Sequence, residues 1–154
     1  MCFVYTTASL LLQVYGYGTV QRVAYTEGMK AKSVSGLGFY VADIAKTAEF
    51  YEMLGFRVGE RTDNYLKIYL NWFWMWFKVA SSEDNPEFVK EAQAEPKGGG
   101  VYINIAVDNA DEAYAEIVAK GYKPSSEPRD WPWGHREFVV RDPDGYKLVF
   151  FQKK

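Results

Sequence analysis

The residues of this chain best suited to chemistry lie in one short run, residues 131–137, which reads Trp-Pro-Trp-Gly-His-Arg-Glu. Histidine gains and loses a proton near neutral pH, so His135, the only histidine of the chain, could act as a general acid or base. Glu137 could activate a water. The sequence holds no nucleophile elbow, phosphate loop or dinucleotide fingerprint to accompany them. Hydrogen bonding by His135 and an ion pair for Glu137 are the simpler interpretations, and no catalytic residue is assigned.

A tight turn follows this run. The motif Asp142-Pro-Asp-Gly145 contains a proline that presets φ and a glycine that accepts positive φ. Residues 136–141 and 146–152 on either side have the β-branched and aromatic content of strands. The sequence therefore predicts a C-terminal hairpin, adjoined by a loop that carries Trp131 and Trp133.

The composition of the chain limits its class. With 154 residues, 48% of them hydrophobic, it can build one well-buried core. Its 18 basic and 20 acidic residues give a formal charge of −2, without the basic excess typical of nucleic-acid binding. Cys2 is the only cysteine, which excludes an intramolecular disulfide and a cysteine-based zinc site. We expect a cytoplasmic protein without a nucleic-acid partner.

Residues 1–28 precede the part of the chain that looks like an ordinary domain. They are apolar in places, but Thr, Ser, Gln and Gly interrupt the run and no basic segment opens it. A spanning helix needs about 20 mostly apolar residues, so neither a membrane partner nor an export signal is expected. We interpret the segment as an appendage: an extra edge strand, an arm that contacts a second copy, or a stretch of no structural consequence.

The sequence contains an internal repeat. Residues 38–56 align without a gap with residues 104–122, and each copy reads as a short strand followed by an amphipathic helix. Gly55 and Gly121 fall at the helix ends, where a left-handed residue is preferred. Each helix is followed by three predicted strands. These are residues 56–62, 65–70 and 72–79 in the first copy, and 122–125, 136–141 and 146–152 in the second.

The predicted fold is α+β, with two tandem β-α-β-β-β modules. The first module is expected at residues 29–82 and the second at residues 101–154. Residues 83–100 connect them, with a short surface helix near residues 84–94 and a flexible Gly98-Gly-Gly100 linker.

This pattern resembles the vicinal oxygen chelate superfamily, which includes glyoxalase I, extradiol dioxygenases, and fosfomycin and bleomycin resistance proteins. The resemblance covers about residues 33–152. The segment Pro132-Trp-Gly-His-Arg-Glu-Phe138 is most similar to the bleomycin-resistance branch. The resemblance implies a cup-shaped mixed sheet with helices outside, and a homodimer in which paired subunits share the clefts.

The superfamily's enzymes hold a divalent metal with His and Glu side chains, and the resemblance places those positions at Gly36, Tyr102 and Val149. Glycine and valine offer no ligand atom, and a lone tyrosine is a poor divalent-metal site. We therefore expect no metal and no cofactor, and the sequence favours ligand binding over catalysis while leaving open whether the protein is an enzyme. A glyoxalase-like or dioxygenase-like enzyme with a displaced metal, or none, is the alternative.

Strand alternation indicates what fills the cup instead. The helix-facing set is uniformly apolar and includes Leu37, Phe39, Val101, Ile103, Ile105, Leu148 and Phe150, with Leu66, Ile68, Met75 and Phe77 on the middle strands. The opposite face is aromatic. With the tryptophan loop, the predicted ligand-binding residues are Tyr40, Tyr69, Trp72, Trp74, Trp76, Tyr102, Asn104, Trp131, Trp133, His135 and Phe151.

Two interpretations of the aromatic face remain. Tyrosine and tryptophan suit ligand pockets and interfaces alike. The first is a metal-independent protein that sequesters a small planar aromatic molecule, such as an antibiotic; the second is a structural or regulatory dimer with tryptophans in its interface. Basic residues share the face, which favours neutral or anionic ligands over a strongly cationic one such as bleomycin. They are Arg57, Arg61, Lys67 and Lys78.

Overall fold

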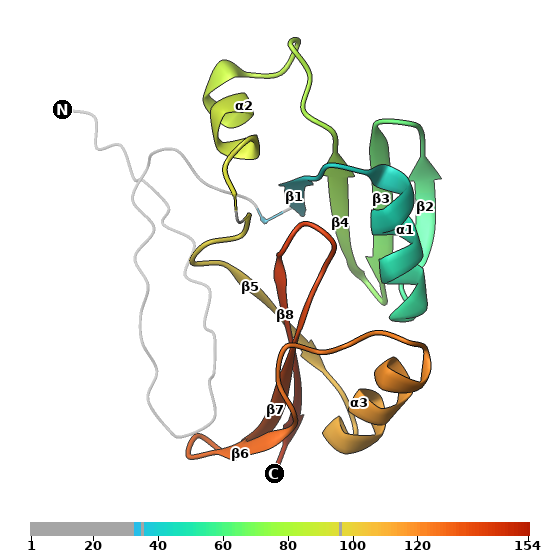
Figure 1. The fold of residues 1–154 in the computed structure, drawn as a ribbon, viewed down its shortest axis with the longest axis vertical. Coiled ribbons are helices and arrows are strands. Elements are labelled where there is room, and N and C mark those ends of the chain that lie inside the picture. The colour runs from blue at the N-terminus through green and yellow to red at the C-terminus, as the bar shows by residue number, and fades with distance from the viewer. Residues whose placement is uncertain (1–32, 35, 96) are drawn as a thin grey trace, which may run out of the picture. The chain divides into compact units, whose positions relative to one another are not determined.

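The computed structural model describes residues 33–34, 36–95 and 97–154, and in them two four-stranded sheets each carry a helix on one face (Figure 1). The first sheet and its helix comprise β1 (Leu37–Tyr40), α1 (Ile44–Met53), β2 (Arg57–Arg61), β3 (Tyr65–Leu70) and β4 (Phe73–Lys78). A short helix, α2 (Pro86–Ala92), follows. The second set comprises β5 (Tyr102–Ala106), α3 (Ala110–Ala119), β6 (Arg129–Trp131), β7 (His135–Arg141) and β8 (Lys147–Lys153).

The two sheets have the same topology. Their strand orders are β1-β4-β3-β2 and β5-β8-β7-β6, with β1 parallel to β4, β5 parallel to β8 and the other pairs antiparallel. The α+β fold with two β-α-β-β-β repeats is thereby confirmed. The interpretations offered for residues 1–28 lie outside the described residues.

Both repeat helices are delimited by their capping residues. The side chain of Asp43 accepts a hydrogen bond from Lys46 N at the start of α1, and that of Asn109 accepts from Asp111 N and Glu112 N at the start of α3. Gly55 and Gly121 follow the helices with φ of 88° and 84°, as predicted from their positions in the repeat.

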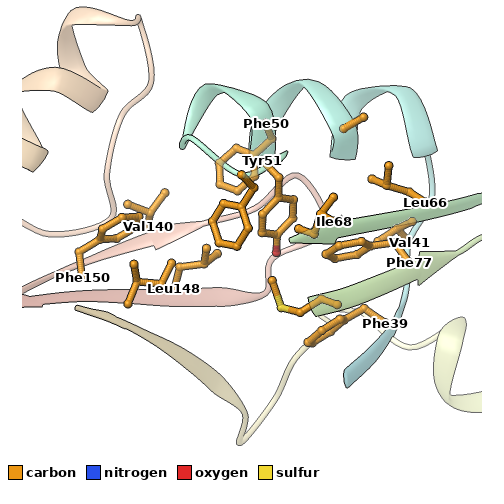
Figure 2. Close-up of a cluster of buried hydrophobic side chains, with 14 of the residues drawn as sticks. Phe39, Val41, Phe50, Tyr51, Leu66, Ile68, Phe77, Val140, Leu148 and Phe150 are labelled. Carbon is orange, nitrogen blue, oxygen red and sulfur yellow. The ribbon is translucent and has the colours of Figure 1, made fainter. Parts of the chain in front are cut away.

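The core lies between the helices and the sheets, and it is continuous across both repeats (Figure 2). Leu66, Ile68 and Phe77 are fully buried in the first sheet, and Phe138 and Leu148 in the second. This confirms the strand register predicted from alternation. Two expected core residues are exposed, Leu37 by 38% and Val101 by 52%. They lie at or before the first residue of an edge strand.

The predicted strand at residues 122–125 does not form. One backbone bond joins it to β7, from Ser125 N to Val139 O at 2.7 Å. Pro124 has no N–H to donate to a ladder, which weakens pairing there. The outer strand is β6 instead, so Trp131 lies in a strand rather than in a loop. His135, one residue before the predicted strand, begins β7.

The Asp142–Gly145 turn joins the two repeats as well as closing the hairpin. Gly145 has φ of 95°, and its N–H donates to Asp142 O at 3.0 Å, as the turn motif predicts. The carboxylate of Asp144 accepts from Ala42 N at 2.8 Å, and the Tyr146 hydroxyl donates to Tyr40 O at 3.0 Å. The turn of the second repeat is thus anchored on the end of β1 in the first.

Candidate ligand-binding site

The face of the second sheet opposite α3 carries a cavity of about 340 Å³, here called the C-terminal cavity. Four of the predicted ligand-binding residues come together in it: Tyr102, Asn104, Trp133 and His135. The other lining residues are Glu137, Val139, Lys147 and Val149. These four were absent from the predicted set, although alternation along β7 and β8 puts them on the same face.

Strand pairing arranges the floor of the C-terminal cavity in rows. From one end of the strands to the other, the rows are Arg141, Lys147 and Tyr102; Val139, Val149 and Asn104; and Glu137, Phe151 and Ala106. The middle row is mostly apolar, and the outer rows carry the charged side chains. The cavity therefore changes in chemical character along the strands.

Glu137 organises one end of the C-terminal cavity. Its Oε1 accepts a hydrogen bond from Trp133 Nε1 at 2.8 Å and lies 3.1 Å from His135 Nδ1. The His135 ring stacks on Phe151 with 4.7 Å between ring centroids. These contacts fix an indole, an imidazole and a carboxylate around one oxygen atom.

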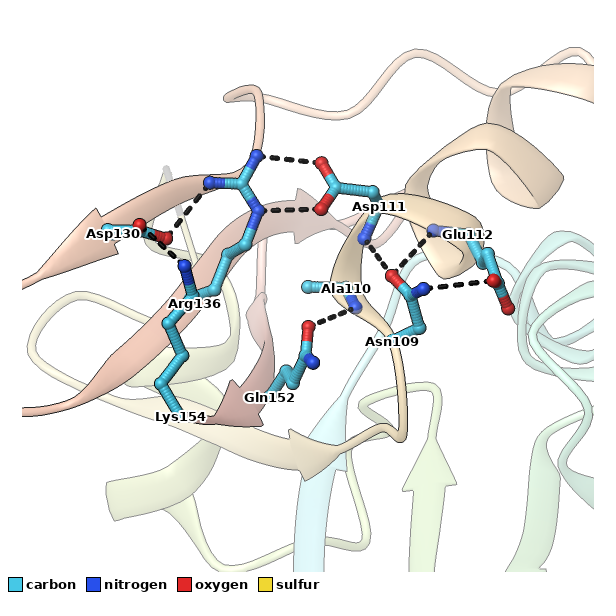
Figure 3. Close-up of polar contacts among 8 residues, drawn as sticks. All are labelled: Asn109, Ala110, Asp111, Glu112, Asp130, Arg136, Gln152 and Lys154. Atoms are coloured by element: carbon cyan, nitrogen blue, oxygen red, sulfur yellow. Dashed lines mark hydrogen bonds and ion pairs between the residues drawn. The ribbon is translucent and has the colours of Figure 1, made fainter.

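Arg136 points to the opposite face of the sheet from Glu137. Its guanidinium donates to both oxygens of Asp111, at 2.6 and 2.7 Å, and to Asp130 at 3.0 Å (Figure 3). The bonds from Arg136 hold the pKa of Asp111 below the usual range, and bonds from Lys154 and then Arg136 do the same for the pKa of Asp130. Lys154 also donates to Asp130 at 2.6 Å. Arg136 thus ties the start of α3 to β6, and Glu137 is left to the cavity.

The tryptophans of the 131–137 run have different environments. The two indoles stack, with centroids 4.6 Å apart and planes 14° from parallel. The guanidinium of Arg129 lies 4.0 Å from the centre of the Trp131 ring. Trp131 thus has Trp133 and Arg129 as neighbours and does not line the C-terminal cavity, whereas Trp133 does and is 58% exposed.

The first sheet carries a larger cavity of about 590 Å³, here called the N-terminal cavity. It lies between the sheet, α2 and the linker, and includes the predicted residues Tyr40 and Trp76. Phe88 of α2 lines it, and the Lys97 side chain contributes an ammonium 3.5 Å from the Asp144 carboxylate. The remaining lining residues are Gly38, Ala92, Ala94, Gly98, Gly99 and Tyr146.

Glycines let the aromatic rings approach this sheet closely. A Cβ atom on Gly38 would lie 2.1 Å from the Trp76 ring, and one on Gly36 would lie 2.7 Å from the Trp74 ring. Both separations are far below van der Waals contact, so only glycine admits the rings there. Lys67 Nζ lies 4.3 Å from the centre of the Trp74 ring. Lys67, one of the four basic residues predicted on this face, is therefore in cation–π contact with Trp74.

Six of the predicted residues therefore divide between two cavities that share no lining residue, and the others line neither. Tyr69 and Trp74 lie on the face of the first sheet and line neither cavity, and Phe151 supports His135. Trp72 was placed at the start of a strand, but β4 begins at Phe73. Trp72 lies in the β3–β4 turn, beside Asn71 with φ of 53°, and is 87% exposed. It is not part of either cavity.

The three positions at which the family resemblance predicts metal ligands can be located in the fold. Tyr102 and Val149 line the C-terminal cavity, and Gly36 lies beneath Trp74. These side chains do not fit a divalent-metal site. Within the described ranges, His, Cys, Asp and Glu side chains form no cluster of three or more that could hold a metal ion.

Comparison with known proteins establishes the class. The family model described as Glyoxalase/Bleomycin resistance protein/Dioxygenase superfamily matches residues 33–150. The chain belongs to this superfamily. A bleomycin resistance protein of Geobacillus stearothermophilus is 30% identical over 120 residues, which cover 73% of this chain and 91% of that protein. A bleomycin resistance protein of Staphylococcus aureus matches to the same extent.

Solved structures show the same fold. A bleomycin-binding protein complexed with bleomycin aligns with a TM-score of 0.56 at 20% identity, covering 80% of this chain and 100% of that one. A glyoxalase/bleomycin resistance protein/dioxygenase family enzyme from Burkholderia phytofirmans aligns with a TM-score of 0.66 at 16% identity, covering 78% and 98%. In the described part of the chain, no helix is long and apolar enough to cross a membrane.

Proposed function

We propose that this protein binds and sequesters a small planar aromatic molecule without a metal, and that binding is its function. The C-terminal cavity carries the proposal. It presents the exposed ring of Trp133 together with Tyr102 and Val149, two positions at which the family resemblance predicts metal ligands. Aromatic rings with a few placed polar groups are typical of sites for small molecules.

The relatives suggest the kind of molecule. Curated relatives are bleomycin resistance proteins, and one structural neighbour is a bleomycin-binding protein. We propose an antibiotic of this type, or a planar compound of similar size, as the ligand. The basic residues of the first sheet favoured a neutral or anionic ligand, but Lys67 and Arg57 lie over Trp74 and Tyr69 respectively. These two basic residues therefore disfavour a cationic ligand less than the sequence indicated.

A homodimer is part of the proposal. The N-terminal and C-terminal cavities have no lining residue in common, so these two cavities do not merge into one site within the described part of the chain. Exposed apolar residues adjoin the C-terminal cavity, among them Tyr102 at 60% and Val101 at 52% exposure. A second copy that covered them would deepen the cavity. We also propose a cytoplasmic location, supported by the single cysteine of the chain.

Tryptophan fluorescence tests the proposal. Bleomycin and a series of planar aromatic compounds are titrated into the full-length protein, with growth protection of a bacterial host measured in parallel. Saturable quenching by at least one compound is expected. A flat response to every compound from a protein that sediments as a dimer would instead favour a structural dimer with tryptophans in its interface. One tightly bound metal per subunit after purification without chelator would contradict metal independence.

A further inference from the structure

The two ends of the C-terminal cavity carry opposite charges. Glu137 stands at one end of its floor and Lys147 at the other, with Val139 and Val149 paired between them. Lys147 is level with Arg141, which is four residues from Glu137 along β7. At about 3.3 Å per residue, the two charged positions are roughly 13 Å apart along the strands.

The carboxylate of Glu137 has one oxygen left for a ligand. Both of its contacts, with Trp133 and His135, are made by Oε1. Oε2 accepts no hydrogen bond from any described residue, although the Glu137 side chain is only 16% exposed. Because no buried side-chain oxygen of the described residues lacks a hydrogen-bond partner, Oε2 is reached from the solvent side, and a cationic donor is the partner that would bind it most strongly.

The ammonium of Lys147 is similarly available. Lys147 lines the cavity and makes no hydrogen bond or salt bridge with the residues that the structure describes. Its neighbour Arg141 is engaged, because it donates to Gly145 O at 2.9 Å. Lys147 is therefore the cation of this end that remains free to meet an anionic group.

We propose that the C-terminal cavity takes an elongated, planar, amphoteric ligand, whose cationic end pairs with Glu137 Oε2 and whose anionic end pairs with Lys147. The ring system between the ends lies over Val139 and Val149, beside the exposed indole of Trp133. This inference rests on the proposed function and refines it, because it names the charge pattern that selects among planar aromatic molecules. Amidines and protonated nitrogen heterocycles suit the first end, and carboxylates suit the second.

Three probes that share one ring system test the inference. They are 6-amidino-2-naphthoate, which carries both charges, 2-naphthamidine, which carries only the cation, and 2-naphthoate, which carries only the anion. Quenching of tryptophan fluorescence gives the dissociation constant of each for the full-length protein. Because a hydrogen bond to a charged group is worth about tenfold or more in affinity, the amphoteric probe should bind at least about tenfold more tightly than either single-charge probe.

Two substitutions test the two charged ends of the C-terminal cavity separately. Glu137→Gln keeps an oxygen acceptor for Trp133 Nε1 but removes the charge, so it should weaken both amidine probes about tenfold and leave 2-naphthoate unchanged. Lys147→Gln should weaken the two carboxylate probes and leave 2-naphthamidine unchanged. Glu49→Gln and Lys123→Gln, at exposed positions outside the lining of the cavity, are the matched controls.

The outcomes distinguish the inference from the function on which it rests. Equal affinity for the three probes, or an equal loss for all three in Glu137→Gln, overturns the charge pattern while leaving aromatic binding intact. Absence of binding by every probe, together with a flat response to bleomycin and to the other planar compounds, contradicts the proposed function and the inference with it.

Discussion

Tyr51 and Asp142, which are 91 residues apart in sequence, share a buried hydrogen bond that links the first repeat to the second. The Tyr51 hydroxyl donates to Asp142 Oδ2 at 3.2 Å. The other carboxylate oxygen accepts from the backbone N–H groups of Asp144 and Tyr146, at 3.0 and 2.9 Å. Tyr51 is fully buried and Asp142 is 4% exposed. The joint between the repeats thus depends on a carboxyl group removed from water.

This carboxyl group should make stability depend on pH. Burial raises the pKa of Asp142 from 3.8 to about 6. A carboxyl whose pKa is higher in the folded than in the unfolded state contributes stability that is complete below pH 4 and is lost as the pH rises through 6. Asp142→Asn keeps an acceptor for the two backbone N–H groups and does not titrate. Between pH 3 and 7, the wild type should lose about 3 kcal/mol of unfolding free energy relative to this variant.

Urea unfolding of both proteins at intervals of half a pH unit measures the difference. Groups far from residue 142 titrate equally in the two proteins, so their contributions cancel in the difference. A difference that stays constant from pH 3 to 7 would show that Asp142 has an ordinary pKa in the folded protein.

The tyrosine of this pair can be tested separately. Tyr51→Phe removes the donor to Asp142 and leaves the ring in place, so it should lower the unfolding free energy by about 1 to 2 kcal/mol at pH 7. Tyr65→Phe is the control, because the Tyr65 hydroxyl is not hydrogen-bonded to any described residue. The link between the repeats is unimportant for stability if both variants unfold at the same urea concentration.

Gly38 should not tolerate a side chain. In Gly38→Ala the new methyl group would lie 2.1 Å from a carbon of the Trp76 ring, so the indole must move. A cost of about 1 to 3 kcal/mol is expected from such overpacking, with a change in tryptophan emission. Gly99→Ala is the matched control, since no atom lies within 4 Å of its added Cβ. Equal thermal stability of the two variants would show that Gly38 does not lie this close to the Trp76 ring.

The exposed tryptophans should differ in their effect on ligand binding. Trp133→Ala removes the ring at the C-terminal cavity and should weaken a planar ligand by about tenfold, since a stacked aromatic pair contributes about 0.5–1.5 kcal/mol beyond the area it buries. Trp72→Ala, at a more exposed tryptophan outside both cavities, should leave affinity unchanged. Isothermal titration calorimetry with the ligand found by fluorescence measures both. Equal losses of affinity in the two variants would indicate that the ligand does not contact Trp133.

Much of the fold could be predicted from the sequence because strands and helices bury one face. The alternation of Leu66, Ile68 and Phe77 with polar and aromatic neighbours fixed the register, and all three are fully buried. Gly55 and Gly121 fixed the ends of the helices. Hydrophobic periodicity and turn residues are local features of the sequence, so they can be recognised without knowledge of the tertiary structure.

The site was predicted less completely, because it depends on the conformation of the turn between β6 and β7 and on how the aromatic face is divided between the two sheets. Alternation placed Tyr102 and Asn104 correctly on one face, but nothing local indicated that the N-terminal and C-terminal cavities are separate. Glu137 was interpreted as an ion-pair residue, whereas its partners are the indole of Trp133 and the ring of His135. That arrangement depends on the turn between β6 and β7, which brings the Trp133 ring to a carboxylate four residues further along the chain.

The stack of Arg129, Trp131 and Trp133 has a consequence for the entropy of binding. Trp133 is held on one side by Trp131 and at its Nε1 by Glu137, so its rotation is restricted in the free protein. Ordering a flexible side chain at an interface costs about 0.5–1.5 kcal/mol of binding free energy. In this protein that cost falls on folding, and a ligand of the proposed kind would meet an indole whose orientation is already fixed.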